Sequence, residues 1–272
     1  MSLIKKYIVC SFLCVLFFFF LSCSSNNDGE ETCRLTSVKA ETLYYEQVPA
    51  IVLANPNFSG KIQFEYNDNG QIVKMLGGPI SYNFGDDEVF FTDDLVNEVS
   101  YQGNIITAQN KYKYEMPASV IDYKVQSGKL ITRTVKSYNN DIQETVNYQY
   151  EYGSNQIIEK KENTIFRIFY FEDDNLVKVE EIHHDYLIGE IVGKTEIILS
   201  NYDSHENLLQ GKYFVNGAFF NAFSKNNFRN FERKHYTYIG DQYVESGNSY
   251  GFNFTTNVGQ NGLVDLFETT CN

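Results

Sequence analysis

Bulky apolar side chains alternate with polar ones along most of this 272-residue chain, and short clusters of Asn, Asp and Gly interrupt the alternation. The clearest unit is Lys61–Met75, in which Ile62, Phe64 and Tyr66 alternate with polar residues before the sequence Asn-Asp-Asn-Gly. Alternation puts one set of side chains on one face of an extended strand. Asn, Asp and Gly tolerate the backbone angles of tight turns. This unit therefore predicts a β-hairpin.

Looser copies of the unit continue down the chain, so the pattern predicts an all-β fold, an antiparallel meander of hairpins from about Leu35 to Phe267. Abundant Tyr (21) and Phe (22), with only 4 Pro, fit pleated strands better than helices. Turns or breaks are expected at clusters of turn-forming residues, namely Gly77-Gly78-Pro79, Gly85-Asp86-Asp87, Asp93-Asp94, Gly103-Asn104, Ser127-Gly128, Asn139-Asn140-Asp141, Gly153-Ser154-Asn155 and Asp173-Asp174-Asn175.

One stretch, residues 205–231, breaks the strand pattern. Its apolar residues fall at spacings of three and four, which fits one face of a short helix: Phe214, Val215, Ala218, Phe219, Ala222 and Phe223. Asn216 and Gly217 weaken that helix. We expect a short helical or loop insertion near 214–224 that covers one face of the sheet, because a single-layer sheet needs a cover. An exposed binding loop is the alternative.

The N-terminus has the features of an export signal. Lys5 and Lys6 precede an apolar run, Ile8–Leu21, that is short for a membrane span. The sequence Leu-Ser-Cys-Ser that ends this run resembles a bacterial lipobox, in which the cysteine, here Cys23, is lipidated and becomes the new N-terminus. This resemblance implies that residues 1–22 are a lipoprotein signal peptide. An ordinary signal peptide with a chance cysteine is the alternative.

The predicted mature chain has two parts. Residues 23–32 are polar and acidic after the cysteine and carry no large apolar side chain, so they form a lipidated flexible tether. Residues 33–272 form a single β-rich domain. Ser24 after the cysteine resembles lipoproteins sent to the outer membrane, and whether the domain faces the periplasm or the cell surface stays open.

Cysteine usage follows from this division. Of the five cysteines, Cys10 and Cys14 leave with the signal peptide and Cys23 carries the lipid. Cys33 and Cys271 remain, one at each end of the domain, and exported chains are oxidised, so a disulfide between them is expected. Two free thiols, or a site closed by other ligands, are the alternatives.

The charge of the chain excludes some partners. The formal net charge is −13, and without Lys5 and Lys6 it becomes −15. Nucleic acid is therefore not an expected partner, since its affinity comes mainly from neutralised phosphates. Attraction to anionic membrane surfaces is disfavoured for the same reason.

The strongest candidate for chemistry is His183-His184-Asp185, because imidazole and carboxylate groups bind zinc and transfer protons. Adjacent residues of a strand point to opposite faces, so His183 and His184 are not expected to chelate together. His205 and His235 could join only through tertiary contact. We therefore interpret the cluster as part of a solvent-facing hairpin.

Acidic pairs are the second candidate for chemistry. Asp86-Asp87, Asp93-Asp94 and Asp173-Asp174 stand at predicted turns, where Asp is common for conformational reasons. The stretch from Glu65 resembles a calcium loop only superficially, because Leu76 stands where the bidentate Glu belongs. Neither a nucleophile elbow nor a phosphate-binding loop occurs. The sequence predicts no catalytic, cofactor-binding or metal-binding residue.

The repeated form of aromatic, any residue, aromatic and then an acidic or Asn/Gly turn resembles the YD-like repeats of bacterial surface proteins, in the divergent form found in Bacteroidetes-type lipoproteins of unknown function. Phe64–Ile72 is the clearest match and Phe169–Leu176 is the second. Asn201-Tyr202-Asp203-Ser204 with Ser224-Lys225-Asn226-Asn227 resembles a C-terminal element of such lipoproteins. Most copies depart from Tyr-Asp at the second position. The resemblance implies a long antiparallel meander and no activity.

Together these observations favour a non-catalytic protein, anchored to the outer membrane by lipid, that acts as a binding or scaffold module of the cell envelope. Its expected partners are the membrane, through the lipid, and an envelope protein or a glycan, since aromatic faces stack on sugars and fill peptide pockets. No cofactor is expected. A surface hydrolase acting on glycans or peptides, with scattered carboxylates, is the alternative.

Overall fold

The computed structural model describes residues 33–39, 60–83, 87–112, 119–139, 142–185, 187–247, 249–253 and 267–271. The chain forms two units, residues 1–33 with 271–272 and residues 34–270, and the fold below is that of the second. Within the described ranges, no helix is long and apolar enough to cross a membrane.

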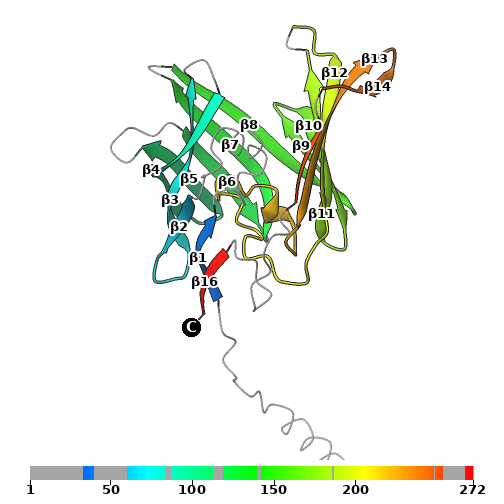
Figure 1. Ribbon diagram of the computed structural model, residues 1–272. Coiled ribbons are helices and arrows are strands. Elements are labelled where there is room, and N and C mark those ends of the chain that lie inside the picture. The colour runs from blue at the N-terminus through cyan, green and yellow to red at the C-terminus, as the bar shows by residue number, and fades with distance from the viewer. Residues whose placement is uncertain are drawn as a thin grey trace, which may run out of the picture. The chain divides into compact units, whose positions relative to one another are not determined.

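The described strands form one sheet, so the predicted all-β antiparallel meander is confirmed (Figure 1). Each strand from β1 to β14 lies beside the next in sequence, β15 pairs with β13, and β16 lies beside β1. The strands are β1 (Cys33–Lys39), β2 (Lys61–Tyr66), β3 (Ile72–Asn83), β4 (Asp87–Gln102), β5 (Ile105–Tyr112), β6 (Ser119–Gln126), β7 (Lys129–Asn139), β8 (Ile142–Tyr152), β9 (Gln156–Lys161), β10 (Thr164–Glu172), β11 (Asn175–His184), β12 (Ile191–Ser200), β13 (Asn230–Ile239), β14 (Gln242–Glu245), β15 (Tyr250–Asn253) and β16 (Phe267–Cys271).

The predicted hairpin at Lys61–Met75 is present as β2 and β3. Ile62 and Phe64 are buried, as the alternation predicted. The backbone N–H of Gly70 donates to the carbonyl of Asn67 at 2.9 Å, and the side-chain oxygen of Asn67 accepts the N–H of Gln71 at 2.9 Å. Gly70 has a φ of +73°, a left-handed conformation that glycine adopts without strain.

Several other predicted turns are confirmed by their backbone angles. Ser127 and Gly128 have φ values of +51° and +75°, and Asp173 and Asp174 have +47° and +63°. Positive φ at both central residues suits two-residue hairpin turns, because it matches the right-handed twist of the strands. The expected turns at 85–87 and 139–141 fall partly outside the described residues.

Two predicted interruptions are wrong. β3 continues through Gly77-Gly78-Pro79, and β4 continues through Asp93-Asp94. Leu76 pairs with Val96 and Gly78 pairs with Thr92, so three residues of β4 lie opposite the single residue Gly77. The turn-forming residues therefore make a β-bulge, which bends the pair of strands without ending either one.

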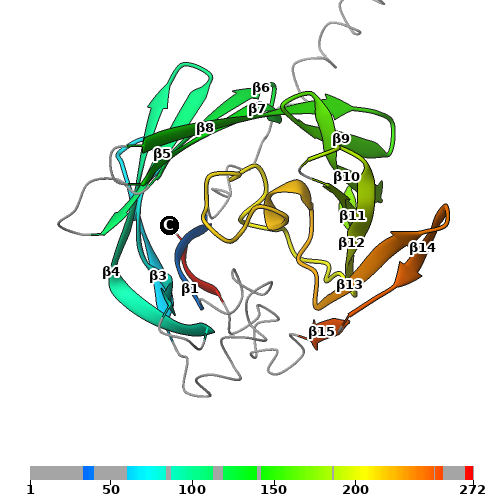
Figure 2. The same ribbon diagram turned by 90° about the horizontal axis from the view of Figure 1, so that it is seen from above.

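The predicted cover of the sheet is confirmed, although it holds little helix. Residues 201–229, here called the covering segment, run through successive turns and one 3-10 helix, Asn221–Phe223. Figure 2 shows the segment in yellow on the concave side of the sheet. Its apolar residues join those of the strands in one core, and the rings of Phe169 and Phe223 lie 4.9 Å apart. The insertion near 214–224 thus buries the sheet's aromatic face.

Repeated tyrosines tie successive strands together. In each case a tyrosine at the end of one strand, or just beyond it in the case of Tyr202, donates its hydroxyl to a carbonyl near the start of the strand before it. The pairs are Tyr66 to Leu35 at 2.6 Å, Tyr101 to Ile72 at 2.9 Å, Tyr152 to Leu130 at 2.9 Å, and Tyr202 to Leu176. Burial raises the pKa of Tyr101 and of Tyr202 to about 12, so these hydroxyls keep their protons and donate.

The alternating strand directions give the sheet two distinct ends. The near end, where β1 starts at the domain's N-terminus, holds the turns at 67–71, 127–128, 153–155 and 173–174 and the covering segment. The far end holds the turns at 162–163, 185–190 and 240–241. These two ends carry different kinds of surface.

Candidate binding sites

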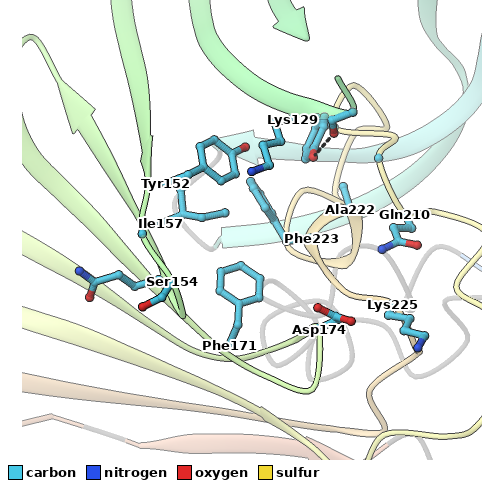
Figure 3. A pocket seen from close by; sticks show the side chains of 15 residues that line it. Lys129, Tyr152, Ser154, Ile157, Phe171, Asp174, Gln210, Ala222, Phe223 and Lys225 are labelled. Carbon is cyan, nitrogen blue, oxygen red and sulfur yellow. Dashed lines mark hydrogen bonds between the residues drawn. The ribbon is translucent and has the colours of Figure 1, made fainter. Parts of the chain in front are cut away.

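A pocket of about 710 Å³ lies at the near end, where three hairpin turns meet the covering segment (Figure 3). Gly128, Ser154 and Asp174 come from the turns, whereas Gln210 and Lys225 come from the segment. The backbone N–H of Lys225 donates to the carbonyl of Asp174 at 3.1 Å, which fixes the segment against the turn. The volume is typical of small-molecule sites.

The wall of this near-end pocket is apolar and largely aromatic. It consists of Tyr152, Ile157, Phe171, Tyr213 and Phe223. Tyr213 donates its hydroxyl to the carbonyl of Gly128 at 3.1 Å, and Tyr152 donates to Leu130. Burial raises the pKa of both tyrosines, which are therefore neutral donors already engaged with backbone. Their rings, rather than their hydroxyls, are what the pocket offers.

The rim of the pocket is polar and exposed. It offers the ammonium groups of Lys129 and Lys225, the amides of Gln156 and Gln210, and the carboxylate of Asp174. Lys129 lies beside Tyr152 and Phe223 in Figure 3, with its Nζ 5.0 Å from the centre of the Tyr152 ring. Hydrogen-bond donors and acceptors thus surround an aromatic wall.

A buried polar layer lies beside the core, and its carboxylate groups are paired with neighbouring side chains. Glu159 is fully buried and accepts hydrogen bonds from Tyr150 at 2.6 Å and from Arg133 at 2.8 Å. Arg167 lies 3.4 Å from the other oxygen of Glu159 and also pairs with Glu181. These groups neutralise one another, so we assign them a structural role.

The predicted separation of the adjacent histidines is confirmed. His183 Nε2 lies 2.8 Å from Thr195 Oγ1, whereas the ring nitrogens of His184 lie 3.1 and 3.2 Å from backbone carbonyl oxygens of Gly189 and Ile165. The tertiary fold adds a contact that the sequence did not predict, because His235 Nδ1 lies 3.0 Å from the same threonine oxygen.

The histidine pair shows no metal-binding arrangement. Burial first, and then the charges of Arg233 and His183, lower the pKa of His235. Across the described residues, no group of three or more His, Cys, Asp or Glu side chains could hold a metal ion. His205 lies apart from this pair, with its Nδ1 3.8 Å from Asp203.

Exposed apolar residues gather at the far end. Of the eleven large apolar side chains exposed within the described ranges, nine lie on β10–β14 or on the turn between β11 and β12. We call these nine the far-end cluster: Ile165, Leu187, Ile188, Ile191, Val192, Tyr238, Ile239, Tyr243 and Val244. Leu187 is 86% exposed and Ile188 is 67% exposed. The other two exposed residues, Ile105 and Tyr138, lie on β5 and β7.

The far-end cluster extends across neighbouring strands and lies on both faces of the sheet, because adjacent strand residues such as Tyr238 and Ile239 point to opposite faces. Gly193 of β12 pairs with Thr237 of β13, which sets Val192 beside Tyr238. The rings of Tyr238 and Tyr243 lie 5.1 Å apart. Exposed apolar residues scattered singly are ordinary, whereas a group gathered at one end of a sheet is a candidate contact surface.

The face of the sheet opposite the core carries charge below this cluster. Glu180 accepts hydrogen bonds from Tyr170 at 2.7 Å, from Lys178 at 3.1 Å and from Lys194 at 3.0 Å. Lys194 also pairs with Glu196 at 2.6 Å. These contacts make a network of paired charges on this face of the sheet.

The two motifs that the sequence paired near the C-terminus lie in contact. The N–H of Asp203 donates to the carbonyl of Asn227 at 3.0 Å, and a carboxylate oxygen of Asp203 accepts from Arg229 Nη2 at 2.9 Å. The side-chain hydroxyl of Ser224 accepts the N–H of Leu176 at 3.1 Å. These bonds join the two ends of the covering segment and attach it to β11.

The remaining residues that the sequence singled out are the acidic pairs and the cysteines. Asp173 and Asp174 stand at a turn, whereas Asp93 and Asp94 stand within β4, as described above. Cys33 and Cys271 lie in β1 and β16, which are neighbours in the sheet, but their side chains lie outside the described residues. The signal peptide 1–22, Cys23 and the tether also lie outside the described residues.

Comparison with known proteins gives structural neighbours only. Neither a family model nor a curated protein matches the chain. A porin-like protein from Bacteroides uniformis ATCC 8492 is 12% identical, with a TM-score of 0.39, over 78% of this chain and 89% of its own. A porin-like protein from Bacteroides vulgatus ATCC 8482 is 13% identical, with a TM-score of 0.39, over 79% of this chain and 89% of its own. At this identity and TM-score, the likeness assigns no function to the chain.

Proposed function

We propose that this protein is a Bacteroidetes-type lipoprotein of the outer membrane, anchored through Cys23, that acts as a non-catalytic binding module of the cell envelope. The observation that carries the proposal is the far-end cluster, which gathers nine of the eleven exposed large apolar side chains of the described residues. Such a group is costly to leave in water and is typical of a protein–protein contact.

The position of the cluster favours a partner other than the anchoring membrane. The tether of residues 24–32 spans at most about 30 Å when extended and joins the domain at the near end. β11, which has 10 residues, separates the near and far ends by roughly 33 Å. The far-end cluster lies at the end of the sheet opposite the start of β1, and we assign it to a second envelope protein with an apolar surface.

The alternative function, a glycan- or peptide-active hydrolase, has less support. Hydrolysis of glycosides commonly uses two carboxylates that flank the bond to be broken. The near-end pocket has one carboxylate in its lining, that of Asp174. Turnover that a single Asp, Glu or His substitution abolishes without unfolding the protein would overturn the non-catalytic assignment.

The test uses the full lipidated chain in its own envelope. A photoreactive amino acid at Ile239 should give a cross-link to one protein, whereas the same group at Ile105, 39% exposed on β5, should not. Once that protein is identified by mass spectrometry and purified, Ile239→Asp should weaken its binding at least tenfold and Ile105→Asp less than twofold. Cross-links to lipid at Ile239, equal cross-linking at both positions, or none at either would contradict the proposal.

A further inference from the structure

We propose that the near-end pocket binds a short saccharide. This inference does not depend on the far-end cluster. An experiment can therefore contradict the saccharide site without contradicting the protein contact, and the reverse. The pocket is large enough for a small ligand, at about 710 Å³, and its wall and rim offer two different kinds of contact.

The wall fits the carbon-bound face of a sugar ring. The rings of Tyr213 and Phe223 lie 5.0 Å apart at 59°, and Phe171 adds a third aromatic ring to the lining (Figure 3). The hydroxyl groups of Tyr152 and Tyr213 are bound to backbone carbonyls, which holds those rings in place before a ligand arrives. A wall fixed in advance loses little conformational freedom when a ligand binds.

The polar rim of the pocket suits the hydroxyl groups of the sugar ring. A sugar hydroxyl both donates and accepts hydrogen bonds, and the rim offers both roles. Lys129 and Lys225 donate, Asp174 accepts, and the amides of Gln156 and Gln210 do both. A ligand made only of hydrocarbon would leave these groups unused, and a simple anion would not use the aromatic wall.

The place of the pocket in the sheet disfavours a peptide. Extended peptides commonly bind by adding a strand to a sheet edge. The pocket lies among the turns of β6–β11, whereas the sheet order ends at β14 and β16. The saccharide is therefore the ligand class that its chemistry and position favour together.

The test measures saturation-transfer NMR with the mature lipidated chain in nanodiscs, using maltotriose, cellotriose and chitotriose as probes. At least one trisaccharide should receive saturation at its ring C–H protons. Phe171→Leu, which removes the aromatic face but keeps most of the volume, should weaken binding at least fivefold. Lys225→Ala and Gln210→Ala, at exposed side chains that the fold tolerates, should each weaken it at least twofold.

Matched controls separate the pocket from the rest of the surface. Tyr138→Leu removes an exposed aromatic ring on β7, and Lys124→Ala removes an exposed lysine on β6, both outside the pocket lining. Both controls should bind as the unaltered chain does. Absence of binding by all three sugars at 10 mM, insensitivity to all pocket variants, or binding of trialanine in place of the sugars would overturn the inference.

Discussion

Arg133 donates to Glu159 at 2.8 Å, and the carboxylate it binds is fully buried. The Arg133 guanidinium also lies 4.1 Å from the centre of the Tyr148 ring and 4.7 Å from that of Phe219 in the covering segment. The pair therefore links β7, β9 and the covering segment at one point. A buried ion pair of this kind adds little net stability over an apolar replacement, but it is costly to break.

Replacing Glu159 by Gln should destabilise the fold strongly. The change leaves Arg133 and Arg167 buried with less compensating charge, and we expect a loss of about 3–5 kcal/mol in the free energy of unfolding. Urea titration followed by circular dichroism measures it. Glu151→Gln is the control, because Glu151 is 56% exposed where it pairs with Lys160, so a loss below about 1 kcal/mol is expected. Equal losses in the two variants would contradict the structural role of Glu159.

Replacing Gly70 by Val should destabilise the β2–β3 hairpin. A β-branched residue is strained at a φ of +73°, and we expect a cost of about 1–3 kcal/mol. Gly70→Asn should cost less, since Asn tolerates left-handed backbone. Thermal unfolding compares the two. A melting temperature unchanged in Gly70→Val would count against this turn conformation.

The contribution of Glu180 should depend on pH. Burial alone would raise the pKa of Glu180, but hydrogen bonds from Tyr170, Lys194 and Lys178 outweigh it and lower the pKa to about 2. Because the folded-state pKa lies below the ordinary value of 4.5, folding favours the ionised form. The resulting stability is present above pH 4.5 and is lost as the pH falls towards about 2.

The measurement compares the unaltered chain with Glu180→Gln by urea unfolding at pH 7 and at pH 2.5. The difference between their unfolding free energies should be larger at pH 7. Glu65→Gln, at an exposed side chain that pairs with Lys74 at 3.3 Å, is the control and should change the unfolding free energy at pH 7 by less than Glu180→Gln does. A Glu180→Gln difference that is constant or grows towards acid pH would refute this assignment.

Cys33 and Cys271 should form a disulfide in the exported protein. The strands that hold them, β1 and β16, are neighbours in the sheet. In the chain-entropy account, closing so long a loop stabilises the fold by roughly 5 kcal/mol, less any strain. Peptide mapping without reducing agent should recover the two cysteines in one linked peptide. Two free thiols in protein purified from the envelope would rule the bond out.

Cys23 should carry lipid, and residues 1–22 should be missing from the mature protein. The basis is the lipobox-like sequence that ends the apolar run. Mass spectrometry of the membrane-purified protein should find a lipidated N-terminal peptide that starts at Cys23. Cys23→Ala should release the chain from the membrane fraction. Recovery of an unmodified Cys23 peptide from the membrane would show that the anchor assignment is wrong.

The sequence by itself determined the strands and most of the turns, because these depend on neighbouring residues. Ile62 and Phe64 alternate with polar residues and are buried, and Asp173-Asp174 takes the left-handed backbone that its residue types tolerate. The same reasoning predicted a cover for the sheet near 214–224, since aromatic strands need a partner to bury them.

Only the tertiary structure decided features that depend on pairing between distant residues. Gly77 and Asp93-Asp94 are turn-forming types, yet their strands are held by neighbours on both sides, and the pairing energy converts the expected interruption into a bulge. His183 and His235 meet at Thr195 because the register of three strands sets them side by side.

The pocket and the far-end cluster depend on the same long-range pairing. The hydroxyl of Tyr213 donates to the carbonyl of Gly128, which is 85 residues away in the sequence. A pattern of neighbouring residues does not predict a contact over such a separation. The far-end cluster gathers because the alternating strand directions bring the tips of the β11–β12 and β13–β14 hairpins to one end of the sheet. Local residue types fix which segments extend or turn, whereas the register of distant strands fixes which side chains meet.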